Sequence, residues 1–200
     1  MQDDRYLTIP NSGEGIYREK GSKFIGFAFP VKSEAEIKTA LESIRKMHPT
    51  ARHHCYAYRI NPLQERWRAN DDGEPSSSAG KPILNQLKSM ELQNALVVVV
   101  RYFGGTLLGV PGLIHAYREA AKLALEDAGR IEAQLMQPVK VACAYAESGE
   151  LMKWLKGKGY LGKPEGHDLL FCINIEIPYS NAAQAIDELK KRNWIVESLE

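Results

Sequence analysis

The sequence predicts a two-domain protein of mixed α/β (α+β) architecture, and three observations support this prediction. The length of 200 residues suits one large domain or two small ones. Up to about residue 128, β-rich stretches alternate with segments of helical periodicity, around one wholly apolar strand. From about Ile131 the order changes to strand, helix, strand, strand, helix, strand. We therefore expect a boundary near 130–136, with domains at 1–132 and 133–200.

The composition indicates a globular chain. An apolar fraction of 44% with 26% charged residues is sufficient for a core and is unlike that of disordered proteins. The longest apolar run, Ala95–Val100, is too short to cross a bilayer, and the first residues lack the pattern of a signal peptide. The three cysteines are odd in number and widely spaced, as expected of reduced, buried thiols. We therefore expect a cytoplasmic protein with no membrane partner.

Extended segments dominate the first part of the chain. Residues 5–31 are β-rich, with a hairpin turn predicted at Gly21–Ser22. Ser33 and Glu36 form the S-x-x-E pattern of a capping box, so a helix begins at Ser33 and ends before Pro49. The next strand reads HHCYAYRI, and ERWRAN is expected to pair back on it as an antiparallel edge. Side chains alternate along HHCYAYRI, so this strand has two faces. One face contains His53, Cys55, Ala57 and Arg59, and the other contains His54, Tyr56, Tyr58 and Ile60.

The middle of the chain predicts two helices around a central strand. Pro82 suits the first position of a helix behind Gly80. The strand ALVVVVR has no alternation, which predicts that both of its faces are covered. Gly129 suits the C-terminal cap of the following helix. The inner face of that helix is expected to contain Leu113, Ala116, Tyr117, Ala120 and Ala124.

The last part of the chain has the strand and helix order of a ferredoxin-like domain. The strands are predicted in QPVKVACAY, near Tyr160, in LLFCINIEIP and in WIVESL, and the helices from Ser148 and in AAQAIDELKKR. This β-α-β-β-α-β order within about 65 residues is the ferredoxin-like pattern.

Three stretches contain residues that could bind a ligand or a metal ion, and the acidic turn DDGEP is the first of them. Its carboxylates, on Asp71, Asp72 and Glu74, are close enough in sequence to hold Mg²⁺ or to orient a water molecule. Alternatively, they hydrogen-bond the backbone of their own turn.

The stretch SSSAGKP is the second. It leads into a helix N-terminus, where free N–H groups favour an anion, and Lys81 lies at that end. Capping of the helix by Ser77 or Ser78 is the alternative.

The stretch RYFGGTLLGVPG is the third. It follows the central strand, and in α/β proteins ligands bind at the carboxyl ends of strands. Its glycines permit close approach of the backbone to a ligand, and Arg101 could face that ligand. A tight connection between strand and helix is the alternative.

A basic patch lies between residues 45 and 68 on a chain whose net charge is only +1. Glu65 is the one acidic residue in this window. Arginines that contact phosphates and aromatic rings that stack on bases would suit RNA. The alternative is that the aromatic residues belong to the core. The predicted nucleic-acid surface contains Arg52, Arg66, Arg68, Tyr56 and Trp67, with Arg59 and Tyr58 nearby.

We predict no metal site, no cofactor and no catalytic residue. His53, His54 and Cys55 are adjacent on a strand, so His54 points away from the other two. The serines lack the G-x-S-x-G pattern of a nucleophile elbow. His115 and His167 are isolated, and we interpret both as structural or surface residues.

Three stretches together resemble the signature of the IMPACT/YigZ family. They are NDDGEPSSSAGKPIL, then VVVVRYFGGTLLGVPGLIHAY, and upstream of both HHCYAYRI, which is similar to that family's HxCxAYR strand. The resemblance covers about residues 13–128. It places the family motif on Arg59, Asp71, Asp72, Glu74, Lys81, Arg101, Gly104, Gly105, Gly109 and Gly112.

The resemblance implies a fold for each domain and a role in translation. The first domain would share the fold of a small-subunit ribosomal protein domain, domain IV of elongation factor G and the GHMP kinases. The second would be similar to a ferredoxin-like domain of elongation factor G. Eukaryotic relatives act in translational control and associate with ribosomes, whereas nucleic-acid or ribosome binding is the usual proposal for bacterial members.

The chain departs from the family pattern at several positions. The segment 76–80 reads SSSAG where the family has S-G-T-A-G. Thr106 and Leu107 stand where a lysine commonly follows the glycine pair, Pro111 replaces a glycine, and His115 replaces an arginine. These departures remove cations from the second glycine-rich loop and leave Lys81 and Arg101 as the main basic groups at the site.

Three functions remain open at this point. The first is a non-enzymatic regulator that binds RNA, the ribosome or a translation factor. The second is an enzyme or binder that acts on a nucleotide or phosphorylated small molecule, with or without Mg²⁺, since the GHMP kinase fold permits one. The third is a protein-interaction module. The identity of the partner and the oligomeric state are not determined by the sequence.

Overall fold

A computed structural model describes residues 4–166 and 169–199. The chain forms two compact units. The N-terminal unit is Tyr6–Ala133, and the C-terminal unit combines the described parts of 1–5 and 134–200. No helix within the described residues is long and apolar enough to cross a membrane.

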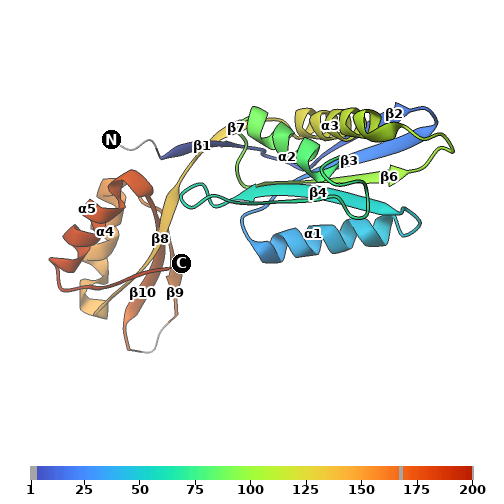
Figure 1. Ribbon diagram of the computed structural model, residues 1–200. Helices are drawn as coiled ribbons and strands as arrows, with labels where there is room; N and C mark the ends of the chain where they lie inside the picture. Colours follow the sequence, from blue (N-terminus) through green and yellow to red (C-terminus); the bar gives the residue numbers. More distant parts are fainter. Residues whose placement is uncertain (1–3, 167–168, 200) are drawn as a thin grey trace. The chain divides into compact units, whose positions relative to one another are not determined.

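A five-stranded antiparallel sheet forms the centre of the N-terminal unit (Figure 1). Its order is β2 (Gly13–Glu19), β3 (Ser22–Pro30), β6 (Ala95–Tyr102), β4 (His53–Ile60) and β5 (Arg66–Asn70). The prediction of a central strand is confirmed, since β6 lies in the middle and is buried from Ala95 to Arg101. The antiparallel edge ERWRAN is also confirmed as β5.

Helices cover both faces of this sheet. Helix α1 (Glu34–Met47) packs on the face that includes Tyr56 and Ile60, whereas α2 (Gly80–Ser89) and α3 (Gly109–Ala128) pack on the face that includes Cys55 and Ala57. The predicted alternation of β4 is thereby confirmed. The inner face predicted for α3 is buried as expected, and Gly129 ends the helix with φ of 76°.

Two local predictions are wrong in detail. The hairpin turn is Lys20–Gly21, with both φ values positive, because Glu19 pairs with Ser22 across a two-residue loop. Helix α2 begins at Gly80, so Pro82 is its third residue. Proline is tolerated there because the N–H groups of the first turn have no partner within a helix.

The Ser33 cap is confirmed, since its hydroxyl accepts from Glu36 N at 3.2 Å.

A two-stranded ribbon contains the residues at which the chain changes unit, Arg5 and Gln134. It pairs β1 (Arg5–Thr8) with β7 (Ile131–Gln134). Leu7 O accepts a hydrogen bond from Gln93 N at 2.8 Å, which ties β1 to the N-terminal unit.

The C-terminal unit is ferredoxin-like, as the sequence predicts. Its elements in chain order are β8 (Met136–Cys143), a short 3-10 turn η1 (Tyr145–Glu147), α4 (Ser148–Lys158), β9 (Gly162–Glu165), β10 (Phe171–Pro178), α5 (Tyr179–Lys190) and β11 (Ile195–Ser198). The sheet order is β11-β8-β10-β9 with antiparallel neighbours. Its core packs strand residues such as Val139 and Ile173 against Leu151, Trp154 and Leu189.

Candidate functional site

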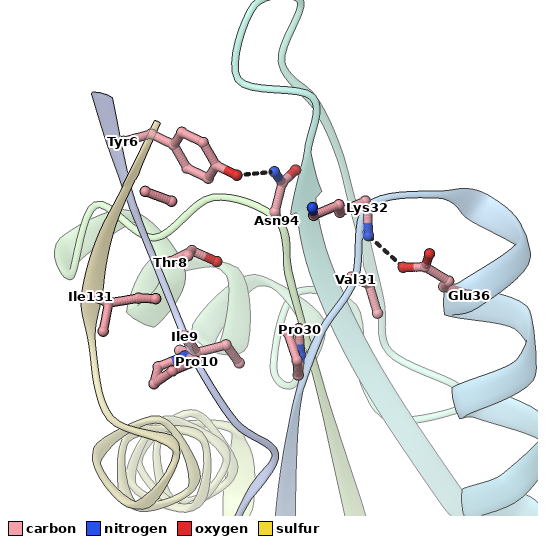
Figure 2. Close-up of a pocket in the computed structure, with 11 residues that line it drawn as sticks. Tyr6, Thr8, Ile9, Pro10, Pro30, Val31, Lys32, Glu36, Asn94 and Ile131 are labelled. Carbon is pink, nitrogen blue, oxygen red and sulfur yellow. Dashed lines mark hydrogen bonds between the residues drawn. The ribbon is translucent and has the colours of Figure 1, made fainter. Parts of the chain in front are cut away.

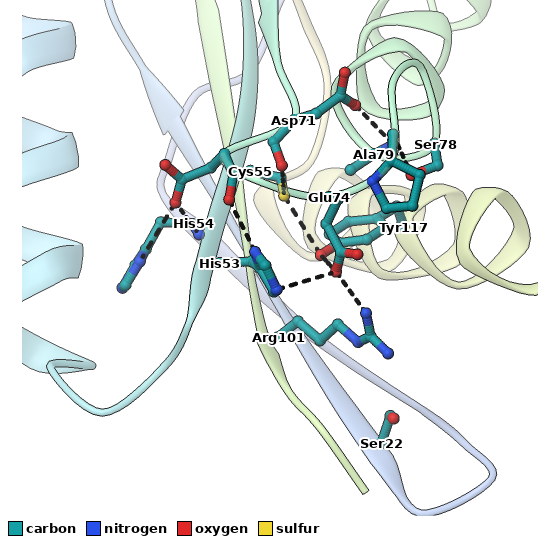
Figure 3. Close-up of polar contacts among 12 residues, drawn as sticks. Ser22, His53, His54, Cys55, Asp71, Glu74, Ser78, Ala79, Arg101 and Tyr117 are labelled. Atoms are coloured by element: carbon teal, nitrogen blue, oxygen red, sulfur yellow. Dashed lines mark hydrogen bonds and ion pairs between the residues drawn. The ribbon is translucent and has the colours of Figure 1, made fainter. Parts of the chain in front are cut away.

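The carboxylates of the acidic turn each have partners within the chain (Figure 3). Asp71 Oδ1 accepts from Ala79 N at 3.0 Å and Gly80 N at 2.9 Å, and its Oδ2 accepts from Ser77 N at 2.9 Å. The N-terminus of α2, where the sequence favoured an external anion, is therefore occupied by an anion of the chain itself. Neither predicted serine caps this helix, since Ser78 Oγ donates to Pro75 O at 2.6 Å.

Asp72 joins the turn to the start of β4. Its Oδ2 accepts from His54 N at 2.7 Å, and its carbonyl lies 2.8 Å from His53 Nδ1. His54 is buried, and this burial lowers the pKa of its imidazole. The two histidines therefore anchor the acidic turn to the sheet, each through a different atom of Asp72.

Glu74 is buried in a polar cluster under the turn. Its Oε1 lies 2.7 Å from Arg101 Nη1 and accepts from the Tyr117 hydroxyl at 2.7 Å. Burial raises the pKa of Tyr117 and that of the Cys55 thiol, whose Sγ donates to Asp71 O at 3.0 Å. A buried thiol with a raised pKa is unreactive. Arg101 thus forms an internal ion pair through Nη1, while its Nε is buried without a hydrogen-bond partner in the described residues. That Arg101 also faces a ligand stays a prediction.

The glycine-rich loop after β6 is held by close backbone contact. A Cβ on Gly104 would lie 1.9 Å from Gly21 C, and Gly104 N donates to Ser22 Oγ at 3.1 Å. Gly105 and Gly109 have φ values of 87° and 72°, which suit glycine. The sequence-based argument that ligands bind at this strand end requires parallel strands, and it does not apply because both neighbours of β6 are antiparallel.

The same loop displays apolar side chains to solvent. Leu107 is 82% exposed and Phe103 is 53% exposed. Val110 and Ile114, one turn apart on α3, are also exposed. We call Phe103, Leu107, Val110 and Ile114 the signature-loop surface. Sequence reasoning missed this surface because it weighed the glycines and cations of the loop, although the run of apolar residues between the glycines was a visible signal.

Comparison with known proteins shows which proteins this chain is similar to. The family model described as the Impact N-terminal domain matches residues 20–125. IMPACT family member YvyE of Bacillus subtilis (strain 168) is 37% identical over 171 residues, which cover 86% of this chain and 77% of that protein. IMPACT family member YigZ of Escherichia coli (strain K12) is 38% identical over 60% of each chain. The chain belongs to the IMPACT family.

The fold comparison covers both units. A crystal structure described as that of an hypothetical protein aligns with 98% of this chain and 98% of its own, with a TM-score of 0.72 and 26% sequence identity. The family match lies within the N-terminal unit, which contains all the motif residues that the sequence identified.

Other IMPACT motif positions in this chain are structural or exposed. Arg59 pairs with Glu65 at 2.8 Å and donates to Leu87 O at 3.4 Å and Leu92 O at 3.0 Å, so it binds carbonyls in and just after the last turn of α2. Lys81 is exposed at the start of α2. Gly112 lies in the first turn of α3, where a Cβ would lie 2.9 Å from Leu108 Cβ.

The predicted nucleic-acid surface is divided between the two faces of the sheet. Trp67 lies opposite Arg59 on the α2 face, with Lys88 Nζ 4.8 Å from its ring. Arg66 pairs with Glu34 of α1 at 3.0 Å. Tyr56 and Arg68 share a groove of about 290 Å³ beside α1, and Arg52 is exposed just before β4; the groove also contains Arg45, Tyr58, Lys38 and the acidic Glu34 and Glu42.

The IMPACT departures in the second glycine-rich loop and at the start of α3 fall on or near the signature-loop surface. Leu107 is part of it, and Pro111 is exposed in the first turn of α3. His115 is exposed and contacts the Tyr17 ring edge-on at 5.6 Å. His167 lies outside the described residues. Within the described ranges, no group of three or more His, Cys, Asp or Glu residues could hold a metal ion.

Proposed function

We propose that this IMPACT-family chain is a non-enzymatic regulator of translation that binds a protein, either a translation factor or a ribosomal protein, through the signature-loop surface. The resemblance of its motifs to those of relatives in translational control supports the field of action. The exposure of Leu107 and Phe103 is the observation that supports the mode of binding. Exposed apolar groups that gather on one part of a surface mark sites of protein interaction.

The signature residues give this surface a fixed position. Gly104 packs against the hairpin turn at Gly21, and the cluster of Glu74, Arg101 and Tyr117 joins the acidic turn to β6 and α3. A loop that is already held in its binding conformation loses less conformational entropy on binding. In this interpretation the motif carries no chemistry of its own, and it positions the apolar residues.

The charges beside the loop indicate the chemistry of the partner. Lys20 lies in the turn that contacts Gly104 and Lys23 lies just after it, and neither forms an ion pair within the described residues. Cations around apolar anchors favour a partner segment in which apolar residues are flanked by Asp or Glu. A protein carrying such an acidic segment is the partner that we propose.

Leu107→Asp in the full chain tests the proposal. A photo-crosslinking residue introduced at position 110 should link to a translation factor or ribosomal protein in RNase-treated lysate, and Leu107→Asp should reduce that link by about tenfold. Leu161→Asp is the matched control, because Leu161 is 88% exposed in the C-terminal unit. Loss of the link on RNase treatment, or equal effects of the two substitutions, would contradict the proposal.

Single-stranded RNA is a second candidate, because Tyr56 and Arg68 line one groove with Arg45. Binding of an oligouridylate should weaken with salt, and Arg68→Glu should lessen the log–log slope by about 0.7. Arg66→Glu is the control, since Arg66 already pairs with Glu34. An affinity that does not change with salt would exclude this candidate.

The nucleotide alternative has little support from the geometry. The N-terminus of α2 binds Asp71, and Arg101 binds Glu74, so two of the groups expected to hold a phosphate have internal partners, whereas Lys81 is exposed. A cytoplasmic location is part of the proposal, in keeping with a role in translation.

A further inference from the structure

A second candidate binding site lies in the N-terminal unit, beside the β1–β7 ribbon (Figure 2). It is a pocket of about 470 Å³, within the range of small-molecule sites. None of the family-motif residues lines it. Its apolar walls are Ile9, Pro10, Pro30, Val31, Ile131 and Ala133.

The polar side of the pocket begins with a fixed amide. Asn94 Oδ1 accepts from Asn61 N at 3.1 Å, and Asn94 Nδ2 donates to the Tyr6 hydroxyl at 3.0 Å. The amide orientation is thus set by its two partners. Because the Tyr6 oxygen accepts this bond, its own hydroxyl proton remains available to a ligand.

Two further groups add donors to the pocket. Thr8 is 8% exposed, and its hydroxyl makes no hydrogen bond with any described residue. A hydroxyl that has no partner within the protein can donate to a ligand in the pocket. Lys32 also lines the pocket and forms no ion pair within the described part of the chain. Figure 2 shows Thr8 and Lys32 on opposite walls.

One carboxylate limits the charge of the ligand. Glu36 lines the rim and accepts from Lys32 N at 2.7 Å. Its negative charge would repel a dianion more strongly than a monoanion. Tyr6, Thr8 and Lys32 can each donate a hydrogen bond into the pocket, whereas the other walls are apolar.

We propose that this pocket binds a small organic monocarboxylate with an apolar body. The carboxylate would accept from Thr8, Tyr6 and Lys32, and the body would pack against the apolar walls beside β7. This site is separate from the signature-loop surface, so either proposal can fail without the other.

Binding of 3-phenylpropionate to the full chain tests this inference, with the neutral 3-phenylpropionamide and inorganic phosphate as companion probes. Amide chemical shifts of residues 6–10, 30–32 and 131–133 should move with the acid. The amide and phosphate should bind at least about tenfold more weakly, since one lacks the charge and the other lacks the apolar body.

Two variants sharpen the test. Lys32→Ala and Thr8→Val should each weaken binding of 3-phenylpropionate by about fivefold to tenfold. Lys46→Ala should leave it unchanged, since Lys46 is an exposed cation near the far end of α1. No shift with the acid, equal binding of acid and amide, or full binding by Lys32→Ala in a chain with native spectra would overturn the inference. Phosphate binding as tight as that of the acid would also overturn it.

Discussion

Asp71 shows how one residue can take the place that a ligand would fill. Its two carboxylate oxygens accept hydrogen bonds from three backbone N–H groups at and just before the start of α2, those of Ser77, Ala79 and Gly80. These bonds satisfy N–H groups that a helix leaves without partners at its start, and the negative charge lies at the positive end of the helix dipole. The side chain therefore acts as the cap, although it lies eight residues before Ala79 in the sequence.

Asp71→Asn should lower the free energy of unfolding of the N-terminal unit by about 1–2 kcal/mol. The amide keeps one acceptor oxygen but loses the charge and the second acceptor. Hydrogen exchange of the β6 amides, which lie at the centre of the sheet, measures this change. Asp127→Asn is the control, because Asp127 accepts one backbone bond from Glu14 N at 2.9 Å on the surface. Equal protection in the two variants would mean that Asp71 is not the cap.

The sequence identified the residues of the candidate site but not their partners. The carboxylates of the acidic turn and Arg101 were recognisable from the motif. The distances that decide their roles join Glu74 to Arg101 and to Tyr117, across many residues. Local periodicity cannot specify such contacts, because they depend on how the turn folds over β4 and β6. A phosphate site and a network of internal ion pairs and hydrogen bonds are therefore not distinguishable from the sequence.

At the scale of elements, α3 lies unusually close to the sheet. Ala120, Ala124 and Ala128 on α3 face the glycines Gly13, Gly15 and Gly26 of β2 and β3. A Cβ on Gly26 would lie 2.3 Å from Ala120 O. Small residues on both sides let the backbones approach, as close packing requires. The alanine spacing was predicted as a helix face, whereas its match to the glycines required the structure.

Gly26→Ala should destabilise the N-terminal unit by about 1–3 kcal/mol, because α3 must shift to admit the methyl group. Urea unfolding followed by exchange of the β6 amides measures the loss. Gly149→Ala should change stability by no more than about 1 kcal/mol, since a Cβ there meets nothing within 4 Å. An unchanged stability for Gly26→Ala would show that the contact with α3 is looser than the structure indicates.

Strand direction was beyond what the sequence could determine. The run ALVVVVR is buried on both faces, and such a run fits a parallel strand or the centre of an antiparallel sheet equally well. The helix ends were better predicted, at Ser33 and at Gly129, because capping depends on residues next to each other. The ligand argument at the end of β6 failed because it depended on direction rather than on burial.

At the scale of the whole molecule, the charges of the predicted basic patch do not form one surface. Trp67 and Arg68 are neighbours in sequence but point to opposite faces of β5, because strand side chains alternate. Arg59 and Arg66 are each paired with a glutamate. A count of charges along the sequence does not show which face of the sheet each side chain occupies or which arginines form ion pairs. For this reason the apolar signature-loop surface, rather than the basic window, carries our proposal for the function.

The first described residues belong to the C-terminal unit, where Asp4 has several partners. Asp4 O accepts from Leu135 N at 2.6 Å, and its Oδ2 accepts from Gln134 Nε2 and from Ser180 N, each at 3.2 Å. The domain boundary predicted at 132/133 remains a proposal about independent folding. These contacts show that the C-terminal unit includes Asp4, which lies just before β1 at the other end of the chain.

Asp4→Asn should therefore lower the stability of the C-terminal unit and leave the N-terminal unit unchanged. The hydrogen bonds from Ser180 lower the pKa of Asp4 below its ordinary value of 3.8. A carboxyl whose pKa is lowered by folding stabilises the folded state above its ordinary pKa, and that contribution is lost as the pH falls through the lowered value. The variant should accordingly lose less stability than the wild type on acidification below about pH 4.

Amide exchange at Ile173 and Ile175, in the core of the C-terminal unit, measures this effect, with the β6 amides as the internal reference. Asp127→Asn is the matched control in the other unit and should leave the exchange of Ile173 and Ile175 unchanged. If Asp4→Asn accelerates neither set, or accelerates both equally, the N-terminal segment does not belong to the C-terminal unit in solution. Faster exchange at Ile173 and Ile175 alone is the expected result, because the lost acceptor serves the start of α5 and β7 rather than the five-stranded sheet.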